Sequence, residues 1–146
     1  MFEMPVDVVC GEEFVPTYAH DGDAGADLRA SIEGPVTINP GESAWVPTGV
    51  HVAIPQGHVG LQFARSGLGC SHGVCLANGV GVIDSGYRGE VRAKLLNLGT
   101  EPYTVRPLDR VCQLVIVPYV RAKFWTVNNL SDSDRGEDGY GSTGVE

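Results

Sequence analysis

The sequence predicts an all-β domain built from short strands and frequent turns. Its 20 glycines and 9 prolines make up about a fifth of the 146 residues, whereas these two residue types average near 12%. Apolar residues alternate with small or polar ones over 50–54 and 58–63, which is the period of two expected for half-buried strands. A chain of this length is expected to form one domain with a sizeable core.

Each element follows from local pattern. In the first half of the chain we expect strands at 6–9, 36–38, 43–46, 50–54 and 58–63, separated by turns at 39–42 and 55–57. One short helix is expected at 66–72, since no helical period extends over ten residues. A strand at 90–97 has Val91, Ala93 and Leu95 on one face, and 100–103 is expected to turn. The apolar run 110–117 predicts a strand buried on both faces.

The most distinctive stretch is 78–90, which reads NGVGVIDSGYRGE. It holds four glycines in thirteen residues, and glycine is used where the chain turns sharply or approaches another group closely. The arms 80–83 and 87–91 predict a hairpin around Asp84, Ser85 and Gly86. Two interpretations remain open on composition alone: an ordinary surface hairpin with an aspartate in its turn, or a binding site.

Charge and composition narrow the function classes. The net charge of −8 argues against non-specific binding to nucleic acid or anionic membranes. No apolar run reaches transmembrane length, and the start, MFEMP, lacks a signal-peptide pattern. The four cysteines contain no CxxC pair, so reduced thiols are expected. A cytoplasmic protein is the resulting expectation.

Four further segments accompany the glycine-rich stretch in order. They read AGADL at 24–28, RSGLG at 65–69, RVCQL at 110–114 and RGEDGYGSTG at 135–144. Together the five segments resemble the five motifs of the trimeric dUTPases, and they span nearly the whole chain. The resemblance implies a jelly-roll-like subunit with one short helix and a flexible C-terminal tail. It also implies hydrolysis of dUTP to dUMP and pyrophosphate, which limits uracil in DNA and supplies dUMP for dTMP synthesis.

The resemblance assigns the glycine-rich stretch to the nucleoside. Asp84 is expected to hydrogen-bond the 3′-hydroxyl and to orient or deprotonate the attacking water. The ring of Tyr87 is expected to pack on the deoxyribose and exclude ribonucleotides. Cytosine inverts the donor and acceptor of uracil, and a site built around one pattern can reject the other by about 10⁴ to 10⁵. Uracil itself is expected to contact the hairpin backbone at Gly81, Val82 and Ile83, helped by Asn78.

The resemblance assigns three other segments to the phosphates. Asp27 is expected to reach a water ligand of the substrate-bound Mg²⁺, an ion that keeps several of its waters. Ser66 is expected to bond the oxygen bridging the α- and β-phosphates, and Arg65 and the Gly67 amide to contact the phosphate chain. Gln113 is placed at the phosphates as well. Without the resemblance, Gln113 would be a structural amide and 65–67 a turn with an N-cap serine.

The composition changes after Trp125. Residues 126–146 hold few apolar side chains and many Ser, Asp, Asn and Gly, so we predict a β domain at 1–125 and a tail that is disordered when empty. By resemblance the tail closes over the substrate. Arg135 then meets the γ-phosphate, Tyr140 stacks on uracil, and Gly141, Ser142 and Thr143 lie at the phosphates. Asp138 departs from the family, which usually carries glycine there.

The resemblance also implies a homotrimer. Each active site would take the first, second and fourth motifs from one chain, the hairpin from a second and the tail from a third. Water would attack the α-phosphorus in line with the leaving pyrophosphate.

Two alternative interpretations of the function stay open. One is a dCTP deaminase, which shares the fold in distant relatives, and the other is a nucleotide-sensing regulatory trimer with a protein partner.

Overall fold

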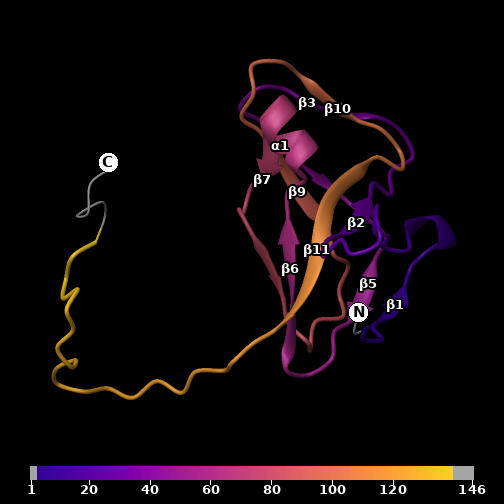
Figure 1. The fold of residues 1–146 in the computed structure, drawn as a ribbon. Coiled ribbons are helices and arrows are strands. Elements are labelled where there is room, and N and C mark those ends of the chain that lie inside the picture. The colour runs from indigo at the N-terminus through magenta and orange to yellow at the C-terminus, as the bar shows by residue number, and fades with distance from the viewer. Residues whose placement is uncertain (1–2, 140–146) are drawn as a thin grey trace.

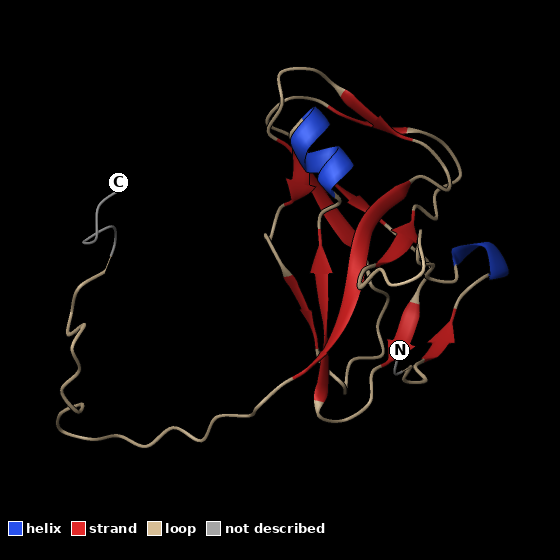
Figure 2. Ribbon diagram, viewed as in Figure 1, coloured by secondary structure: helices blue, strands red, loops and turns tan. Residues whose placement is uncertain are grey.

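Short strands and a single α-helix at one end of the body make up the computed structural model, which describes residues 3–139 (Figures 1 and 2). This confirms the predicted all-β class. The helix is α1 (Ser66–His72), and one 3₁₀ turn lies at Glu12–Phe14. The strands are β1 (Asp7–Val9), β2 (Ala26–Arg29), β3 (Val36–Ile38), β4 (Ser43–Val46), β5 (His51–Ala53), β6 (His58–Phe63), β7 (Val74–Leu76), β8 (Gly81–Ile83), β9 (Ala93–Asn97), β10 (Tyr103–Val105) and β11 (Arg110–Pro118).

Two sheets and two separate strand pairs make up the body. The larger sheet has the order β2-β11-β6-β8 and the smaller one β4-β9-β7, while β1 pairs with β5 and β10 with β3. All of these pairings are antiparallel. One hydrophobic cluster joins the two sheets, with Leu28, Ile83 and Leu114 from the first and Val46 and Leu95 from the second.

On β9 the apolar side chains face the core, as predicted. On β6 the predicted apolar face is the less buried one. Ala93 and Leu95 are buried, whereas Arg92 and Lys94 lie over the exposed ring of Trp45. On β6 the more buried face carries Gly60 and Gln62. A Cβ at Gly60 would lie 2.7 Å from Ile54 Cδ1, so the missing side chain makes room for the core. The apolar face of β6 is left half-buried.

The predicted hairpin is wrong in its pairing. Strand β8 pairs with β6, Gly81 lying opposite Gln62, and the second arm forms a loop whose Glu90 makes only an isolated bridge to His51. Local bonds explain the loop, because the Tyr87 amide donates to the Asp84 carbonyl at 3.0 Å and closes a turn. The next strand therefore begins at Ala93, three residues later than predicted.

Three other differences concern strand limits. The sequence did not predict β2, β7 or β10, and the turn expected at 100–103 gives way to β10 at Tyr103. Strand β11 lies between β2 and β6. Val111 and Cys112 are both buried, as two-sided burial requires, but Val115–Val117 are only half-buried in the single chain.

Beyond Pro118 the chain leaves the body (Figure 1). We call residues 119–125 the arm and residues 126–146 the tail. Every residue from 119 to 138 is exposed, and the exposed side chains include Val120 at 95% and Phe124 at 94%. In the described residues no helix has the length and apolar character that a membrane crossing requires.

Candidate active site

Three of the predicted motifs converge on one carboxylate. Asp27 on β2 is 2% exposed and lies opposite Gln113 of β11. Its Oδ1 accepts hydrogen bonds from Arg65 Nε at 2.8 Å and from Gln113 Nε2 at 3.3 Å, and its Oδ2 accepts one from Arg110 Nη1 at 3.1 Å. The structure therefore joins Asp27, Arg65 and Gln113 in one cluster, and two guanidinium groups surround a single buried carboxylate.

Arg110 was missed as a site residue, although it begins the fourth motif. Its sequence position alone did not indicate its direction, because the pairing register with β2 shifts between Arg110 and Cys112. Such an irregularity re-aims a side chain relative to the regular alternation of a strand. Here it brings the Arg110 guanidinium to Asp27.

The second motif forms the start of α1. The helix begins at Ser66, and Arg65 is its N-cap residue with an extended backbone and no side-chain cap bond. The alternative of an N-cap serine is therefore wrong. Ser66 and Gly67 are exposed in the first turn, directly beside the arginine that bonds Asp27. The Ser66 hydroxyl and the Gly67 amide can thus meet a ligand at the same place as Arg65.

The nucleoside residues form a second region. An open cavity of about 220 Å³ is lined by Asn78, Gly81, Val82, Ile83 and Tyr87, together with Gln62, Trp45 and Glu90–Arg92. A Cβ at Gly81 would lie 2.8 Å from Gln62 Oε1 and 3.0 Å from Gln62 Cβ, so a larger residue there would displace the Gln62 side chain. The Tyr87 hydroxyl donates to the Glu90 carbonyl at 3.0 Å, and a Cβ at Gly89 would overlap the Tyr87 ring. These contacts hold the ring at the rim of the cavity.

Asp84 follows β8 and is exposed. It lines a different cavity of about 470 Å³, with Val59, Leu61 and Val82 of the body and Tyr119 and Arg121 of the arm. In the single chain, Asp84 does not line the cavity that Asn78 lines. Asp27, Arg65 and Gln113 do not line that cavity either. The predicted site is therefore present as separate parts.

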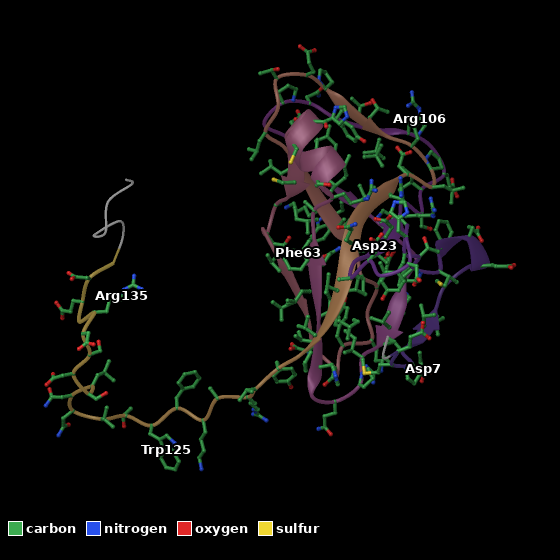
Figure 3. All side chains as sticks on the ribbon, viewed as in Figure 1. Asp7, Asp23, Phe63, Arg106, Trp125 and Arg135 are labelled. Atoms are coloured by element: carbon green, nitrogen blue, oxygen red, sulfur yellow. The ribbon has the colours of Figure 1, made fainter. Side chains whose placement is uncertain are left out.

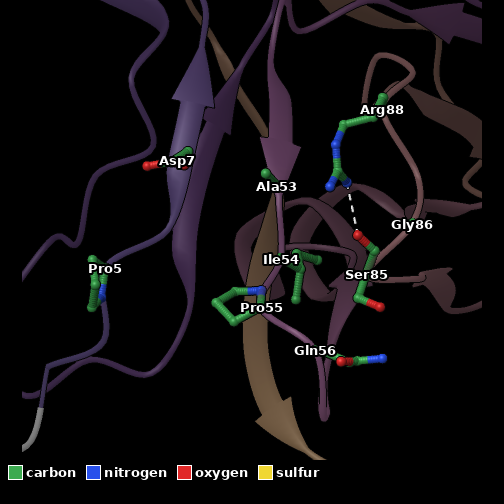
Figure 4. A pocket seen from close by; sticks show the side chains of 9 residues that line it. All are labelled: Pro5, Asp7, Ala53, Ile54, Pro55, Gln56, Ser85, Gly86 and Arg88. Carbon is green, nitrogen blue, oxygen red and sulfur yellow. Dashed lines mark hydrogen bonds between the residues drawn. The ribbon is translucent and has the colours of Figure 1, made fainter.

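The loop that carries Asp84 is braced from its other side. Arg88 Nη1 donates to the carbonyls of Ser85 at 2.7 Å and Tyr87 at 2.8 Å. Ser85, Gly86 and Arg88 border a cavity of about 490 Å³ whose opposite wall includes Pro5 and Asp7 (Figure 4). None of the described residues that are predicted to contact the nucleotide lines this cavity.

Residues 126–139, the described part of the tail, lie away from both regions (Figure 1). Arg135 projects from the extended segment, far from the body (Figure 3), and its Nε donates to the Asp138 carbonyl at 2.8 Å. Tyr140, Gly141, Ser142 and Thr143 lie outside the described residues. Of the predicted tail contacts, only the position of Arg135 is thus described.

The cysteines are free thiols, as expected. Burial raises the pKa of Cys112 to about 11. This thiol is therefore protonated and neutral at neutral pH, and it accepts a hydrogen bond from Gln62 Nε2 at 3.2 Å.

A sequence model of the dUTPase family matches residues 12–144. The match covers all five motifs and every predicted site residue. The chain belongs to the dUTPase family. The rival interpretation as a dCTP deaminase has no support from this match.

Individual relatives agree with this assignment. The deoxyuridine 5′-triphosphate nucleotidohydrolase of Burkholderia cenocepacia (strain HI2424) is 48% identical over 134 residues, which cover 90% of each chain. The Staphylococcus bacteriophage 80alpha dUTPase, solved with dUPNHPP, is 29% identical and superimposes with a TM-score of 0.87 over 97% of this chain and 99% of that one. A mutant dUTPase from phage phi11 of S. aureus, described as coordinating a structural Mg(II) ion, is 26% identical, with a TM-score of 0.76 over 86% and 98%.

These similarities confirm the predicted family, the all-β fold and the predicted activity. This dUTPase is a dUTP diphosphatase, which hydrolyses dUTP. The roles of individual residues, the metal and the assembly are separate questions, and the geometry of the three regions bears on each of them.

Proposed function

We propose that Asp84 activates the water that attacks dUTP, at a site assembled from three copies of the chain. The observation that carries this proposal is the separation of the site into parts. The Asp27 cluster and the cavity beside Gly81 share none of their residues, and residues 126–139 of the tail extend away from the body. Since each part carries a family motif, we infer that other chains supply the missing parts.

The outer face of the larger sheet supports an assembly. Leu61 of β6 lies opposite Val82 of β8 and Val115 of β11, and Val59 lies opposite Val117. Residues paired in this way share one face of a sheet, so these side chains form an apolar stripe. Val82 is 65% exposed. Contiguous exposed apolar surface marks interaction sites, and a trimer covers this stripe.

The arm supports the same conclusion. Val120, Phe124 and Trp125 are 95%, 94% and 73% exposed, although burying one such side chain is worth roughly 1.5–3 kcal/mol. An extended apolar segment that leaves its own body is suited to packing on a neighbouring copy. We propose a homotrimer in which the arm crosses to the next chain and carries the tail towards a neighbour's site.

The Asp27 cluster is proposed to bind the triphosphate. Arg65 uses Nε for Asp27, which leaves its other guanidinium donors for phosphate oxygens, and charged bonds of this kind are among the stronger hydrogen bonds. Ser66 and the Gly67 amide extend the same donor surface, and Gln113 holds the carboxylate between the two arginines. Arg110 adds a second cation.

Mg²⁺ fits this cluster through water and substrate. A carboxylate offers about four lone-pair sites, and Asp27 uses three of them for Arg65, Gln113 and Arg110. The remaining site suits one bond to a metal-bound water. Among the described residues no group of three or more His, Cys, Asp or Glu forms a metal site, so the substrate phosphates would supply most of the ligands. When bound, the ion offsets phosphate charge.

The chemical step is proposed as follows. Uracil binds beside Gly81, Val82 and Ile83 with Asn78 at its edge, and the Tyr87 ring lies against the deoxyribose. Asp84 accepts a proton from water as that water attacks the α-phosphorus, and pyrophosphate leaves on the opposite side. The tail closes over the phosphates and excludes bulk water, as active-site lids do.

Asp84→Asn tests the assignment of the base. The change keeps the shape of the side chain and removes its proton-accepting charge, so we expect kcat to fall by at least about 10², with binding of dUTP and the Tm unchanged. Steady-state release of pyrophosphate and calorimetric titration measure the two quantities. Asp7→Asn, an exposed aspartate on β1, is the matched control and keeps wild-type turnover. Near-normal turnover of Asp84→Asn would contradict the assignment.

The regulatory alternative and the cytoplasmic location stay predictions. A nucleotide-sensing role would require a protein partner that distinguishes the empty trimer from the trimer with dUTP. Co-purification of such a partner, followed by its release on addition of dUTP, would establish that role beside catalysis.

A further inference from the structure

Glu90 ends the glycine-rich stretch, and its side chain is half-buried. Its Oε1 accepts hydrogen bonds from two successive backbone amides, that of Thr48 at 3.0 Å and that of Gly49 at 2.7 Å. Both amides belong to the turn between β4 and β5, where Gly49 has a φ of +69°. Bonds from a backbone N–H to a carboxylate are among the stronger hydrogen bonds. The Glu90 side chain therefore ties the glycine-rich stretch to a turn that lies 41 residues earlier in the chain.

The backbone of Glu90 in turn holds the Tyr87 side chain. The Tyr87 hydroxyl donates to the Glu90 carbonyl at 3.0 Å. Tyr87 is 45% exposed, so burial alone does not determine where its ring lies. Both residues line the cavity that Asn78 lines. The position of the ring thus depends on a carbonyl whose own residue is held by the turn at 48–49.

The backbone that follows Glu90 is held by other contacts. The Val91 amide donates to the Val50 carbonyl at 2.8 Å, and the Thr48 hydroxyl donates to the Val91 carbonyl. Val91 is also 3% exposed and belongs to the hydrophobic core. None of these contacts uses the Glu90 carboxylate, so its loss is expected to leave the core in place. The effect of removing the Glu90 side chain should therefore be confined to the loop that carries Tyr87.

We propose that Glu90 is a positioning residue for sugar selection: its carboxylate fixes its own backbone carbonyl, and this carbonyl holds the Tyr87 ring against the deoxyribose. The inference rests on the proposed function, which places the Tyr87 ring at the sugar, and it adds the residue that keeps the ring there. A ring that is held in place overlaps a 2′-hydroxyl, whereas a ring that can move lets that hydroxyl enter. Glu90 acts through Tyr87 and is assigned no contact with the reacting atoms.

Glu90→Ala tests the inference, with dUTP and UTP as the two substrates. The change removes the bonds to the turn at 48–49, so the ratio of kcat/KM for dUTP over UTP should fall at least about fivefold, the value of one hydrogen bond. Glu90→Gln keeps an oxygen that can accept from both amides and should bring the ratio back close to the wild-type value. Glu42→Ala is the matched control, because Glu42 accepts a bond from Asn39 Nδ2 at 3.0 Å in a turn that does not line the cavity. It should keep the wild-type ratio.

The ratio separates positioning from stability. If Glu90 only stabilised the fold, Glu90→Ala would lower the Tm and slow both substrates alike, and an unchanged ratio would overturn the inference. A fall in the ratio that Glu90→Gln does not restore would also overturn it, since the accepting oxygen would then not be the cause.

A double substitution shows whether Glu90 acts through the ring. In a Tyr87→Ala background, Glu90→Ala should change the ratio no further, because residues that act as one unit are not additive. A full additional effect would overturn the inference. An unchanged ratio for Tyr87→Ala alone would instead contradict the sugar contact in the proposed function, and the inference would fall with it.

Tyr87→Phe keeps the test decisive if Glu90→Ala does not fold, as judged by Tm. It removes only the hydroxyl that bonds the Glu90 carbonyl and leaves the bonds of the Glu90 carboxylate intact. The ratio of kcat/KM for dUTP over UTP must fall there too. An unchanged ratio would mean that the link between Glu90 and the ring carries no selectivity, which overturns the inference.

Discussion

The body and the C-terminal segment of this dUTPase position their functional residues by opposite means. In the body, Asp27 has three hydrogen-bond partners and is 2% exposed, so folding of one chain determines where its carboxylate lies. From Tyr119 to Asp138 every residue is exposed, and Arg135 bonds only a carbonyl of its own turn. The tail can therefore act only by docking, onto substrate or onto a neighbouring chain.

Removing the tail should have the largest effect, because it should abolish the docked contacts and leave the folded body unchanged. Truncation after Leu130 keeps the arm and deletes Arg135 and the rest of the fifth motif. Because residues 131–138 of the deleted segment are all exposed, we expect the Tm and the trimeric mass to stay at their wild-type values. We expect kcat/KM for dUTP to fall at least about 10²-fold, since the lid and its phosphate contacts are lost.

Differential scanning calorimetry, light scattering and a pyrophosphate assay measure these three quantities. Truncation after Val145, one residue from the end, is the control and should keep full activity. A large fall in Tm for the Leu130 truncation would show that the tail stabilises the body, and would contradict a tail that acts only by docking.

Proteolysis should sharpen the contrast within the intact protein. Trypsin cuts exposed, extended segments, so we expect the first cut after Arg135. Addition of a non-hydrolysable dUTP analogue with Mg²⁺ should slow this cut at least about fivefold, because a closed tail is no longer open to the protease. Mass spectrometry of timed samples locates the cut. Equal rates with and without the analogue would mean that the tail does not close.

The same contrast explains how far the sequence predicted the structure. The limits of β3, β4, β6 and α1 were predicted as they are found, because each has a clear local period or turn signal. Strands β2, β7 and β10 were not predicted; β7 begins two residues after α1 ends, and β10 begins within the segment predicted as a turn. The pairing of β8 was wrong, because the turn closed by Asp84 and Tyr87 competes locally with a hairpin.

Some residues of the candidate site were predicted from the sequence, and others were missed. The sequence placed Asp27, Arg65 and Gln113 together through the family motifs, and the structure brings them into one cluster. Gln62 was missed because a glutamine in a period-two strand indicates the solvent face. Its side chain packs against Gly81, a residue of another strand, where a Cβ would lie 2.8 Å from Gln62 Oε1. That is tertiary information, which a local pattern does not contain.

The smallest effect is expected at Asp138, where the family usually carries glycine. In the tail turn, Arg135 bonds the Asp138 backbone carbonyl, so no ion pair with Arg135 is seen to neutralise the carboxylate. A charge about 7 Å from a phosphate charge costs roughly 2 kcal/mol at an effective dielectric of 20, and salt and Mg²⁺ reduce this. Asp138→Gly should therefore lower the Kd of a non-hydrolysable analogue a few-fold.

Salt and a second variant distinguish charge from backbone freedom at this position. The Kd of Asp138→Gly should depend less on salt than that of the wild type, and Asp138→Asn should give part of the gain, because it removes the charge and keeps the side chain. Calorimetric titration at two salt concentrations measures both. Weaker binding by Asp138→Gly would show that the aspartate is useful.

Mixing two inactive chains tests the shared site most directly. Asp84→Asn supplies an intact tail, and the Leu130 truncation supplies an intact Asp84. If the hairpin and the tail of each site come from different chains, every mixed trimer of either composition has one complete site in three. Random mixing of equal amounts makes three quarters of the trimers mixed, so about a quarter of wild-type activity should return after joint refolding, as cyclic symmetry requires. No recovery, with mixed trimers demonstrated by mass, would mean that each chain closes its own tail over its own Asp84.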